Sequence, residues 1–473
     1  MATDIDALEA ALDFDGDFVP EHDLDVLRRG RDLHLDHYGG GRLPFAAIGA
    51  TGLVHQFVEL DGPDRGRVLD VLDASGGYAS ACLGAASEVS ERALVRAVRT
   101  GGHATDELAS LERSRLLVTL FGPDGLWAGH FPAGEYHVSG RNSGSEGMEL
   151  ALRLVLEARV DHRRLRPSAR LGGRDRILAF EGAWHGWTGG LVPLLNRRHY
   201  RFGLPGPEPE GAYGLRIDHI SFGDADAVST YLAAHGEQLA AVIVEPVQGD
   251  AGIQVPPRGY LRGLARAVRR AGALLVADEV LTFAKTGGFF AMADDEGPIP
   301  TDITVIGKSL GMGALSTAMV IARRELALRP TGAVSTSDLR PLTCAVIGDG
   351  LRHIVAEGLL EQSRATGRAL HDLLRRELVE AFPGLYREAR GIGLLQGVEL
   401  TEAAAARLPQ LRSALIRSGV YVEFMAGAGR RSNGERYVHP TLRVAPPLTA
   451  GPKDAERIVE RIAAGSARTG AAR

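Results

Sequence analysis

The chain has 473 residues, of which 45% are hydrophobic and 24% charged, and its formal net charge is −5. This length predicts two or three domains with a large core, and the slightly acidic balance argues against nucleic acid or a membrane surface as the partner. No apolar run reaches the roughly 18 residues of a transmembrane helix, and the acidic N-terminus lacks a signal-peptide pattern, so we expect a cytoplasmic protein. The two cysteines, Cys82 and Cys344, are too few for a disulfide framework or a structural zinc site, and we expect both in the core.

The first 65 residues are weakly patterned, with short segments that glycine and proline interrupt. From about residue 140 to 325, strand-like and helix-like patterns alternate, and a helix is expected over residues 258–270, where apolar residues recur at helical spacing. The strand candidates are mostly continuous apolar runs, as is typical of strands covered on both faces: 176–180, 239–245, 273–278, 303–307 and 317–322. This alternation predicts an α/β fold with a mostly parallel central sheet covered by helices.

Helical patterns dominate after about residue 345, with short strand patterns at 393–400 and 437–445. We expect an N-terminal segment over residues 1–65, a large domain over 66–340 and a smaller C-terminal domain over 341–473. The smaller domain should be of the α+β class and include part of the N-terminal segment. Ligands of α/β sheets bind near the C-terminal ends of the parallel strands, so candidate functional residues should lie where these strands end.

Lysine is rare in this chain, and one of the few lysines ends a predicted strand. Only three of the 54 lysine and arginine residues are lysines, and Lys308 follows the apolar run 303–307. Arginine stays protonated, whereas lysine can lose its proton, attack a carbonyl and form a Schiff base. Asp278 ends another apolar run, and a buried carboxylate needs a partner such as a pyridinium N–H. An amine and a carboxylate at two strand ends indicate pyridoxal phosphate as the cofactor.

Three further polar segments lie beside predicted elements. Residues 142–147, rich in serine and glycine, precede a helix whose free N–H groups can hold a phosphate, although such residues are also ordinary helix caps. After the strand that ends at Phe180, Trp184 could stack on a planar ring with His185 beside it, or the two could be a packed tryptophan and a hydrogen-bonded histidine. Residues 245–250 bring three polar side chains to the end of another strand.

Together these motifs resemble the class III aminotransferases of the fold-type I pyridoxal-phosphate enzymes, the group that includes ornithine, 4-aminobutyrate and omega-amino-acid aminotransferases. The resemblance extends from about Leu69 to Ile462, and the motifs follow the family's order and approximate spacing. They are Ser143-Gly144-Ser145-Glu146, Trp184-His185-Gly186, Glu245-Pro246-Val247-Gln248-Gly249, Asp278-Glu279-Val280 and Gly307-Lys308-Ser309-Leu310-Gly311.

The resemblance implies roles for the residues around the cofactor. Lys308 would hold pyridoxal 5′-phosphate as a Schiff base and later move a proton. Asp278 would pair with the pyridine nitrogen, and Trp184 would stack on the ring where the family usually has tyrosine or phenylalanine. Gly144 and Ser145 would bind the phosphate through backbone and hydroxyl groups.

The resemblance also implies substrate and subunit contacts. Thr336 matches a threonine that reaches the phosphate of the neighbouring subunit, which implies a homodimer with shared active sites. Arg443 matches an arginine that binds a substrate carboxylate, and Tyr78 falls near a substrate-side aromatic position. Asp250 occupies the place of an acidic residue that can cover this arginine in ornithine-type members. The alternative is that Arg443 is locked permanently to Asp250 and never meets substrate.

Several positions depart from the family pattern. Leu281 stands where many members have a glutamine next to the cofactor's phenolic oxygen, and the loop 282–287 is one residue shorter than usual. The turn 311–316 lacks the usual proline. Trp187 stands where some members offer an arginine to a second carboxylate. We therefore expect a substrate with one carboxylate, or a comparable group that accepts hydrogen bonds, near the reacting amine. Its distal part should carry apolar or aromatic groups.

The resemblance implies an aminotransferase, a transferase of nitrogenous groups that moves an amino group from a small-molecule donor to a carbonyl acceptor. Aminomutase, racemase or decarboxylase chemistry on the same scaffold is the nearest alternative, since aminomutase-like members also tend to carry an apolar residue at the position of Leu281. A non-catalytic binding homologue is a further alternative. The joint presence of Lys308 and Asp278 argues against it.

Overall fold

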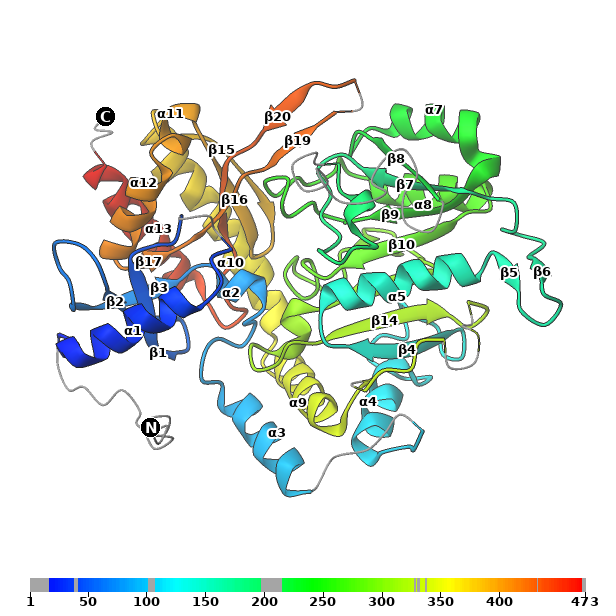
Figure 1. Cartoon of the computed structure of the whole chain (residues 1–473), viewed down its shortest axis with the longest axis horizontal. Helices are drawn as coiled ribbons and strands as arrows, with labels where there is room; N and C mark the ends of the chain where they lie inside the picture. Colours follow the sequence, from blue (N-terminus) through cyan, green and yellow to red (C-terminus); the bar gives the residue numbers. More distant parts are fainter. Residues whose placement is uncertain are drawn as a thin grey trace.

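The computed structural model describes residues 17–469 apart from residues 38–40, 101–106, 197–214, 327, 328, 330, 331, 337 and 432. In Figure 1 a large sheet flanked by helices forms one side of the molecule, and smaller sheets form the other side. The first and last helices, α1 (Glu21–Leu33) and α13 (Pro452–Arg468), both lie with the smaller sheets. None of the helices in the described ranges has the length and apolar character needed to span a bilayer.

The central sheet has seven strands, and only one of them runs against the others. The order is β4 (Tyr136–Arg141), β14 (Ala318–Arg323), β13 (Ile303–Ile306), β10 (Leu274–Glu279), β9 (Leu239–Val244), β7 (Arg176–Phe180) and β8 (Arg216–Ile220). β14 is antiparallel to both of its neighbours, and the other adjacent pairs are parallel. The prediction of a mostly parallel sheet is confirmed, and all five predicted strands lie within one residue of the observed ends.

Helices cover both faces of the central sheet, which explains why its strands are continuously apolar. On β10, Leu274 and Val276 belong to the hydrophobic cluster that includes α5 (Gly144–Glu157). The alternate residues Leu275 and Ala277 belong to a different cluster with α8 (Tyr260–Arg270). Successive side chains of a strand point to opposite faces, so the two clusters lie on the two sides of the sheet.

The smaller sheets combine distant parts of the chain. One is antiparallel, in the order β15 (Tyr386–Ile392), β16 (Leu395–Leu400), β21 (Thr441–Val444) and β18 (Glu423–Met425). The other contains β1 (Phe45–Thr51), β2 (Val54–Glu59), β3 (Val68–Asp73) and β17 (Val420–Tyr421). The short strand β17 pairs in parallel with β3, so the N-terminal strands and the C-terminal part share a sheet. α10 (Leu359–Leu374), α12 (Leu408–Arg417) and α13 contribute to the common core.

A third group of helices packs beside the central sheet. It comprises α3 (Glu88–Arg99), α4 (Leu111–Phe121) and α9 (Pro341–Ala356), which share one hydrophobic cluster. Cys82 and Cys344 are buried in this cluster as free thiols, as the composition predicts. Trp127 is its largest buried side chain and meets Phe283 edge-on, with ring centroids 5.7 Å apart. The loop that follows β10 is thereby fixed to the helical group.

Candidate functional site

The C-terminal ends of neighbouring parallel strands carry the charged residues of the site. Asp278 lies near the end of β10, Lys308 follows β13 after one glycine, and Glu245 directly follows β9. β10 and β13 pair in parallel with Asp278 opposite Val305, so the carboxylate and the lysine leave the sheet at the same edge. One edge of the sheet thus carries an amine and two carboxylates.

Lys308 begins a tight turn in a strained backbone conformation. Its φ of +46° lies in the left-handed region, which non-glycine residues seldom adopt and which costs about 1–3 kcal/mol. Burial lowers the pKa of Lys308 to about 8, and the positive charge of Arg443 acts in the same direction. The next residue fixes the turn, because the Ser309 hydroxyl donates to the backbone carbonyl of Ala79 at 3.0 Å. An amine with this pKa is partly neutral near pH 8, as a nucleophile requires.

Asp278 is held by a histidine and by the backbone. Its Oδ2 lies 2.9 Å from Nδ1 of His185, and its Oδ1 accepts from the backbone N–H of Val280 at 3.1 Å. Asp278 is 4% exposed and His185 1% exposed. Glu245 lies close by and accepts from the backbone N–H of Trp184 at 2.7 Å. Burial raises the pKa of Glu245 to about 7, and the neighbouring Asp278 adds to the rise.

The N-terminus of α5 is anchored beside the end of β10. Ser143 caps the helix by accepting from the backbone N–H of Glu146 at 3.2 Å. A Cβ atom on Gly144 would lie 2.6 Å from a methyl group of Val280, so only glycine permits this close approach. Gly186, with a φ of +110°, would place a Cβ 2.5 Å from the Ser145 hydroxyl. The first helical N–H groups have no acceptor within the helix, so this end can receive an anion.

Two tryptophans on the segment after β7 lie beside these residues. Trp184 is half-buried, whereas Trp187 is 54% exposed, and their rings meet edge-on with centroids 4.6 Å apart. The backbone N–H of Trp187 donates to the Ser145 hydroxyl at 3.3 Å. The segment after β7 is thus tied to the first turn of α5.

A strained turn carries Tyr78 to the same region. Four consecutive residues from Gly76 to Ala79 have positive φ, including 58° at Tyr78. Asp73 stabilises the start of this turn by accepting from the backbone N–H of Ser75 at 2.9 Å. Tyr78 is 53% exposed, and its ring centroid lies 5.9 Å from the guanidinium carbon of Arg443.

Arg443 makes a buried ion pair that the sequence analysis missed. Its Nε donates to Oε2 of Glu423 at 2.8 Å, and its Nη2 donates to the same oxygen. Both side chains are 4% exposed. Among the carboxylates of the described ranges, Glu423 rather than Asp250 makes this contact, and Asp250 lies half-buried in the bend after β9. A glutamate inside the apolar run 420–425 was the available signal, because a buried charge needs a partner.

Lys285 is a fully buried lysine near the site. It is 0% exposed, and its Nζ donates to the backbone carbonyl of Pro446 at 2.8 Å. Burial lowers the pKa of Lys285 to about 8, as it does that of Lys308. The contact ties the loop after β10 to the segment after β21. The sequence places Lys285 outside the strand-end motif and does not reveal its burial.

Thr336 lies on the surface near the start of α5. It is exposed and lines a cavity of about 560 Å³ together with Asn142 and Glu146. Its own carbonyl accepts from the Nε of Arg340 at 2.9 Å.

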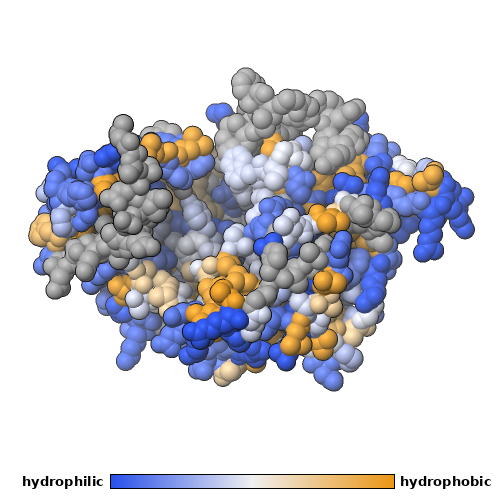
Figure 2. Space-filling model, turned by 60° about the horizontal axis from the view of Figure 1, so that its bottom comes forward, coloured by the Kyte–Doolittle hydropathy of each residue, from blue (hydrophilic) through white to orange (hydrophobic). Residues whose placement is uncertain are grey.

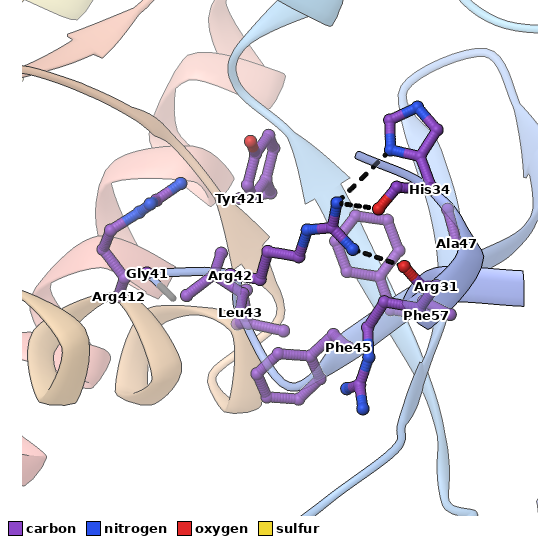
Figure 3. A pocket seen from close by; sticks show the side chains of 12 residues that line it. Arg31, His34, Gly41, Arg42, Leu43, Phe45, Ala47, Phe57, Arg412 and Tyr421 are labelled. Atoms are coloured by element: carbon purple, nitrogen blue, oxygen red, sulfur yellow. Dashed lines mark hydrogen bonds between the residues drawn. The ribbon is translucent and has the colours of Figure 1, made fainter. Parts of the chain in front are cut away.

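A separate cavity of about 390 Å³ lies between the N-terminal segment and α12 (Figure 3). Its lining includes Arg412, Phe45, Phe57 and Tyr421. Arg42, which also lines it, donates to the backbone carbonyl of His34 at 2.7 Å. Within the described residues its lining includes neither Lys308 nor the strand-end carboxylates, so it lies apart from the candidate site.

Comparisons with known proteins agree with the geometry. Residues 65–465 match the family described as aminotransferase class-III. The mitochondrial ornithine aminotransferase of Oryza sativa subsp. japonica is 31% identical over 317 residues, which are 66% of this chain and 62% of that protein. Ornithine aminotransferase 2 of Staphylococcus aureus strain Mu50 is 31% identical over 325 residues, 68% of this chain and 73% of that protein. The chain thus spans less than two thirds of the rice relative's length.

Solved structures share the fold of the whole chain. The ornithine aminotransferase from Toxoplasma gondii ME49 superposes with a TM-score of 0.78 at 22% identity, covering 99% of both chains. An aminotransferase from Bacillus anthracis has a TM-score of 0.77 at 20% identity, covering 95% of this chain and 99% of its own. A further Toxoplasma gondii ornithine aminotransferase structure is described with partial occupancy of PLP at its active site.

Glu423→Ala should reduce the free energy of unfolding by about 3–5 kcal/mol, because it leaves the Arg443 guanidinium buried without a counter-charge. The matched double variant Glu423→Leu/Arg443→Met removes both charges and should unfold at a urea concentration close to that of the wild type. Urea unfolding followed by fluorescence measures both. A single variant as stable as the wild type would show that the pair is not buried in solution.

Proposed function

We propose, because the chain belongs to the class-III aminotransferase family, that it transfers an amino group between an amino acid or amine and a carbonyl acceptor, with pyridoxal 5′-phosphate as cofactor. One observation carries the proposal. A half-buried lysine with a lowered pKa and a buried, hydrogen-bonded aspartate leave adjacent parallel strands at the same edge of the sheet.

The residues present suit this cofactor. Asp278 provides an acceptor for the pyridine nitrogen, and Lys308 provides the amine for covalent attachment. The N-terminus of α5, with Gly144 and Ser145, offers N–H and hydroxyl donors to the phosphate. The close packing at Gly144 keeps these donors beside the end of β10. Trp184 supplies the aromatic face for the ring. When bound, pyridoxal phosphate supplies an aldehyde that combines with amines and a ring that accepts electrons from the reacting carbon.

Lys308 and Asp278 divide the proton chemistry. Lys308, whose lowered pKa of about 8 leaves its amine partly neutral, would take the proton from the substrate carbon and pass it on within the site. Asp278 would keep the pyridine nitrogen protonated, and its contact with His185 at 2.9 Å holds the carboxylate in place.

Covalent uptake of the cofactor by the cofactor-free protein should follow the ionisation of Lys308. The neutral amine is the nucleophile and its pKa is about 8, so the rate should rise about tenfold per pH unit below pH 8 and level off above it. Stopped-flow absorbance measures the rate, and Lys308→Ala, which should show no covalent uptake, is the control. A rate that still rises steeply between pH 9 and pH 10 would contradict the lowered pKa.

The proposed reaction is tested by single amino donors added without an acceptor. A donor should convert the bound cofactor stoichiometrically to its aminated form and release one equivalent of carbonyl product, which mass spectrometry detects. Asp278→Asn should retain the cofactor but react roughly 10² times more slowly or worse, because the ring nitrogen loses its ionised partner. A near-normal rate in Asp278→Asn would make Asp278 a structural residue.

Leu281 is the observation that favours a second reaction class. It is 8% exposed and lies in an apolar cluster with Val247, Ile253 and Ala445, so it offers no polar contact to the cofactor's phenolic oxygen. Aminomutase, racemase or decarboxylase chemistry would return the cofactor unaminated after each turnover. The single-donor experiment therefore separates these reactions from transamination.

We also propose that two copies of the chain form a homodimer with shared active sites. Exposed apolar side chains on α3 and α4, among them Val98 and Val118, each 68% exposed, support an interface there. An open cavity of about 1160 Å³ lies between these helices and α9, with Leu111, Leu351 and Val355 in its lining. Figure 2 shows apolar surface on the face that includes this region. An apolar surface of this kind marks an interaction site.

Val118→Asp should weaken the dimer and lower cofactor retention together, whereas Val438→Asp, a control on the exposed β20 (Arg436–Val438), should change neither.

Thr336→Ala should leave the dimer intact and weaken cofactor retention about tenfold or more, since a hydrogen bond to a charged phosphate contributes ~1.5–3 kcal/mol. Sedimentation velocity measures the association state. A cofactor-loaded, active monomer would refute the shared site.

A further inference from the structure

The ion pair of Arg443 and Glu423 lies at the site and is fixed by the sheet. The two residues are directly opposite each other on the antiparallel strands β21 and β18. Side chains of such opposed residues share one face of the sheet, so their contact follows from strand pairing and not from a movable loop. Both charges act on Lys308: the charge of Arg443 lowers the pKa of the lysine, and the charge of Glu423 raises it. The pair is therefore near the reacting amine.

The pair already gives Arg443 a carboxylate partner. Nε and Nη2 of Arg443 both donate to Oε2 of Glu423, and the ring of Tyr78 lies 5.9 Å from the guanidinium carbon. A substrate carboxylate at Arg443 would bring a second negative charge against Glu423 in a buried environment, where like charges repel strongly. Lys285 also lies in the field of Glu423, but its Nζ already donates to the backbone carbonyl of Pro446.

One buried carboxylate oxygen of Glu423 has no hydrogen-bond donor among the described residues. No group in the described part of the chain donates to Oε1 of Glu423, although this atom is buried. Its other oxygen, Oε2, takes both contacts from Arg443. A buried carboxylate oxygen without a hydrogen bond is costly, and a ligand N–H or O–H that reaches it gains a charge-assisted hydrogen bond.

We propose that Glu423 sets the substrate class of the enzyme. With Arg443 it forms a site that accepts hydrogen bonds. This site selects substrates that carry an uncharged or cationic hydrogen-bond donor, such as an amide N–H, beside the reacting carbon in place of a free carboxylate. This inference rests on the proposed aminotransferase function. It replaces the expectation that Arg443 binds a substrate carboxylate.

Two pairs of matched probes test the proposal on the wild-type holoenzyme. L-Alaninamide should aminate the bound cofactor at least tenfold faster than L-alanine at equal, sub-saturating concentration, followed by absorbance. Propanamide and propanoate lack the amine and cannot react, so calorimetry of their binding gives a readout that does not depend on turnover. Propanamide should bind at least tenfold more tightly.

Glu423→Gln keeps the shape of the side chain and removes its charge, so Arg443 should become available to carboxylates. The amide-to-carboxylate ratio should fall at least tenfold in both measurements. Glu399→Gln is the matched control, because Glu399 is a buried carboxylate of the same sheet that pairs with Arg390 at 2.7 Å, and it should leave both ratios unchanged.

The proposal is overturned if the wild type uses L-alanine as well as L-alaninamide and binds propanoate as tightly as propanamide. The proposal is also overturned if Glu423→Gln leaves the amide-to-carboxylate ratio unchanged in both measurements. If Glu423→Gln does not fold, the wild-type comparison decides alone. Failure of every amino donor to aminate the cofactor would instead refute the proposed function, and the binding of propanamide against propanoate would still test the role of Glu423.

Discussion

The parallel pairing of β10 with β13 is the constraint on which the rest of the site depends. Their backbone hydrogen bonds set Asp278 opposite Val305, and Lys308 follows the end of β13 after one glycine. The lysine therefore leaves the sheet at the same edge as the aspartate. Both strands pack into hydrophobic clusters on two faces, which prevents the register from slipping. The other site elements then attach to this edge. Gly144 packs on Val280, and the Ser309 hydroxyl holds the turn that carries Tyr78.

Burial is the shared cause of the unusual ionisation in this region. It lowers the pKa of both Lys308 and Lys285 to about 8, and it raises the pKa of both Glu245 and Glu279 to about 7. The four groups nevertheless differ in what they contact. Glu279 accepts from two backbone N–H groups, Glu245 accepts from two others, and Lys285 donates to a carbonyl. The charges of Asp278 and Glu245 act on Lys308, and its strained backbone sets it apart from Lys285.

Local patterns were enough to predict the central sheet and its strand-end residues. Continuous apolar runs mark strands buried on both faces, and the rarity of lysine directs attention to Lys308. Long-range pairing could not be predicted in the same way. The partner of Arg443 depends on the placement of β18 beside β21, and the burial of Lys285 depends on the segment after β21. The pairing of β3 with β17 likewise joins residues far apart in the sequence, for which no local pattern exists.

The central claim is that the half-buried Lys308, and not the fully buried Lys285, is the amine that holds the cofactor. Borohydride reduction of the protein loaded with pyridoxal phosphate, followed by peptide mapping, tests this claim most directly. The strand-end geometry predicts the reduced cofactor on Lys308, with Lys285 and Lys453 unmodified. Stoichiometric label on Lys285 or Lys453 would contradict the account, because the reacting amine would then lie away from Asp278 and the end of β13.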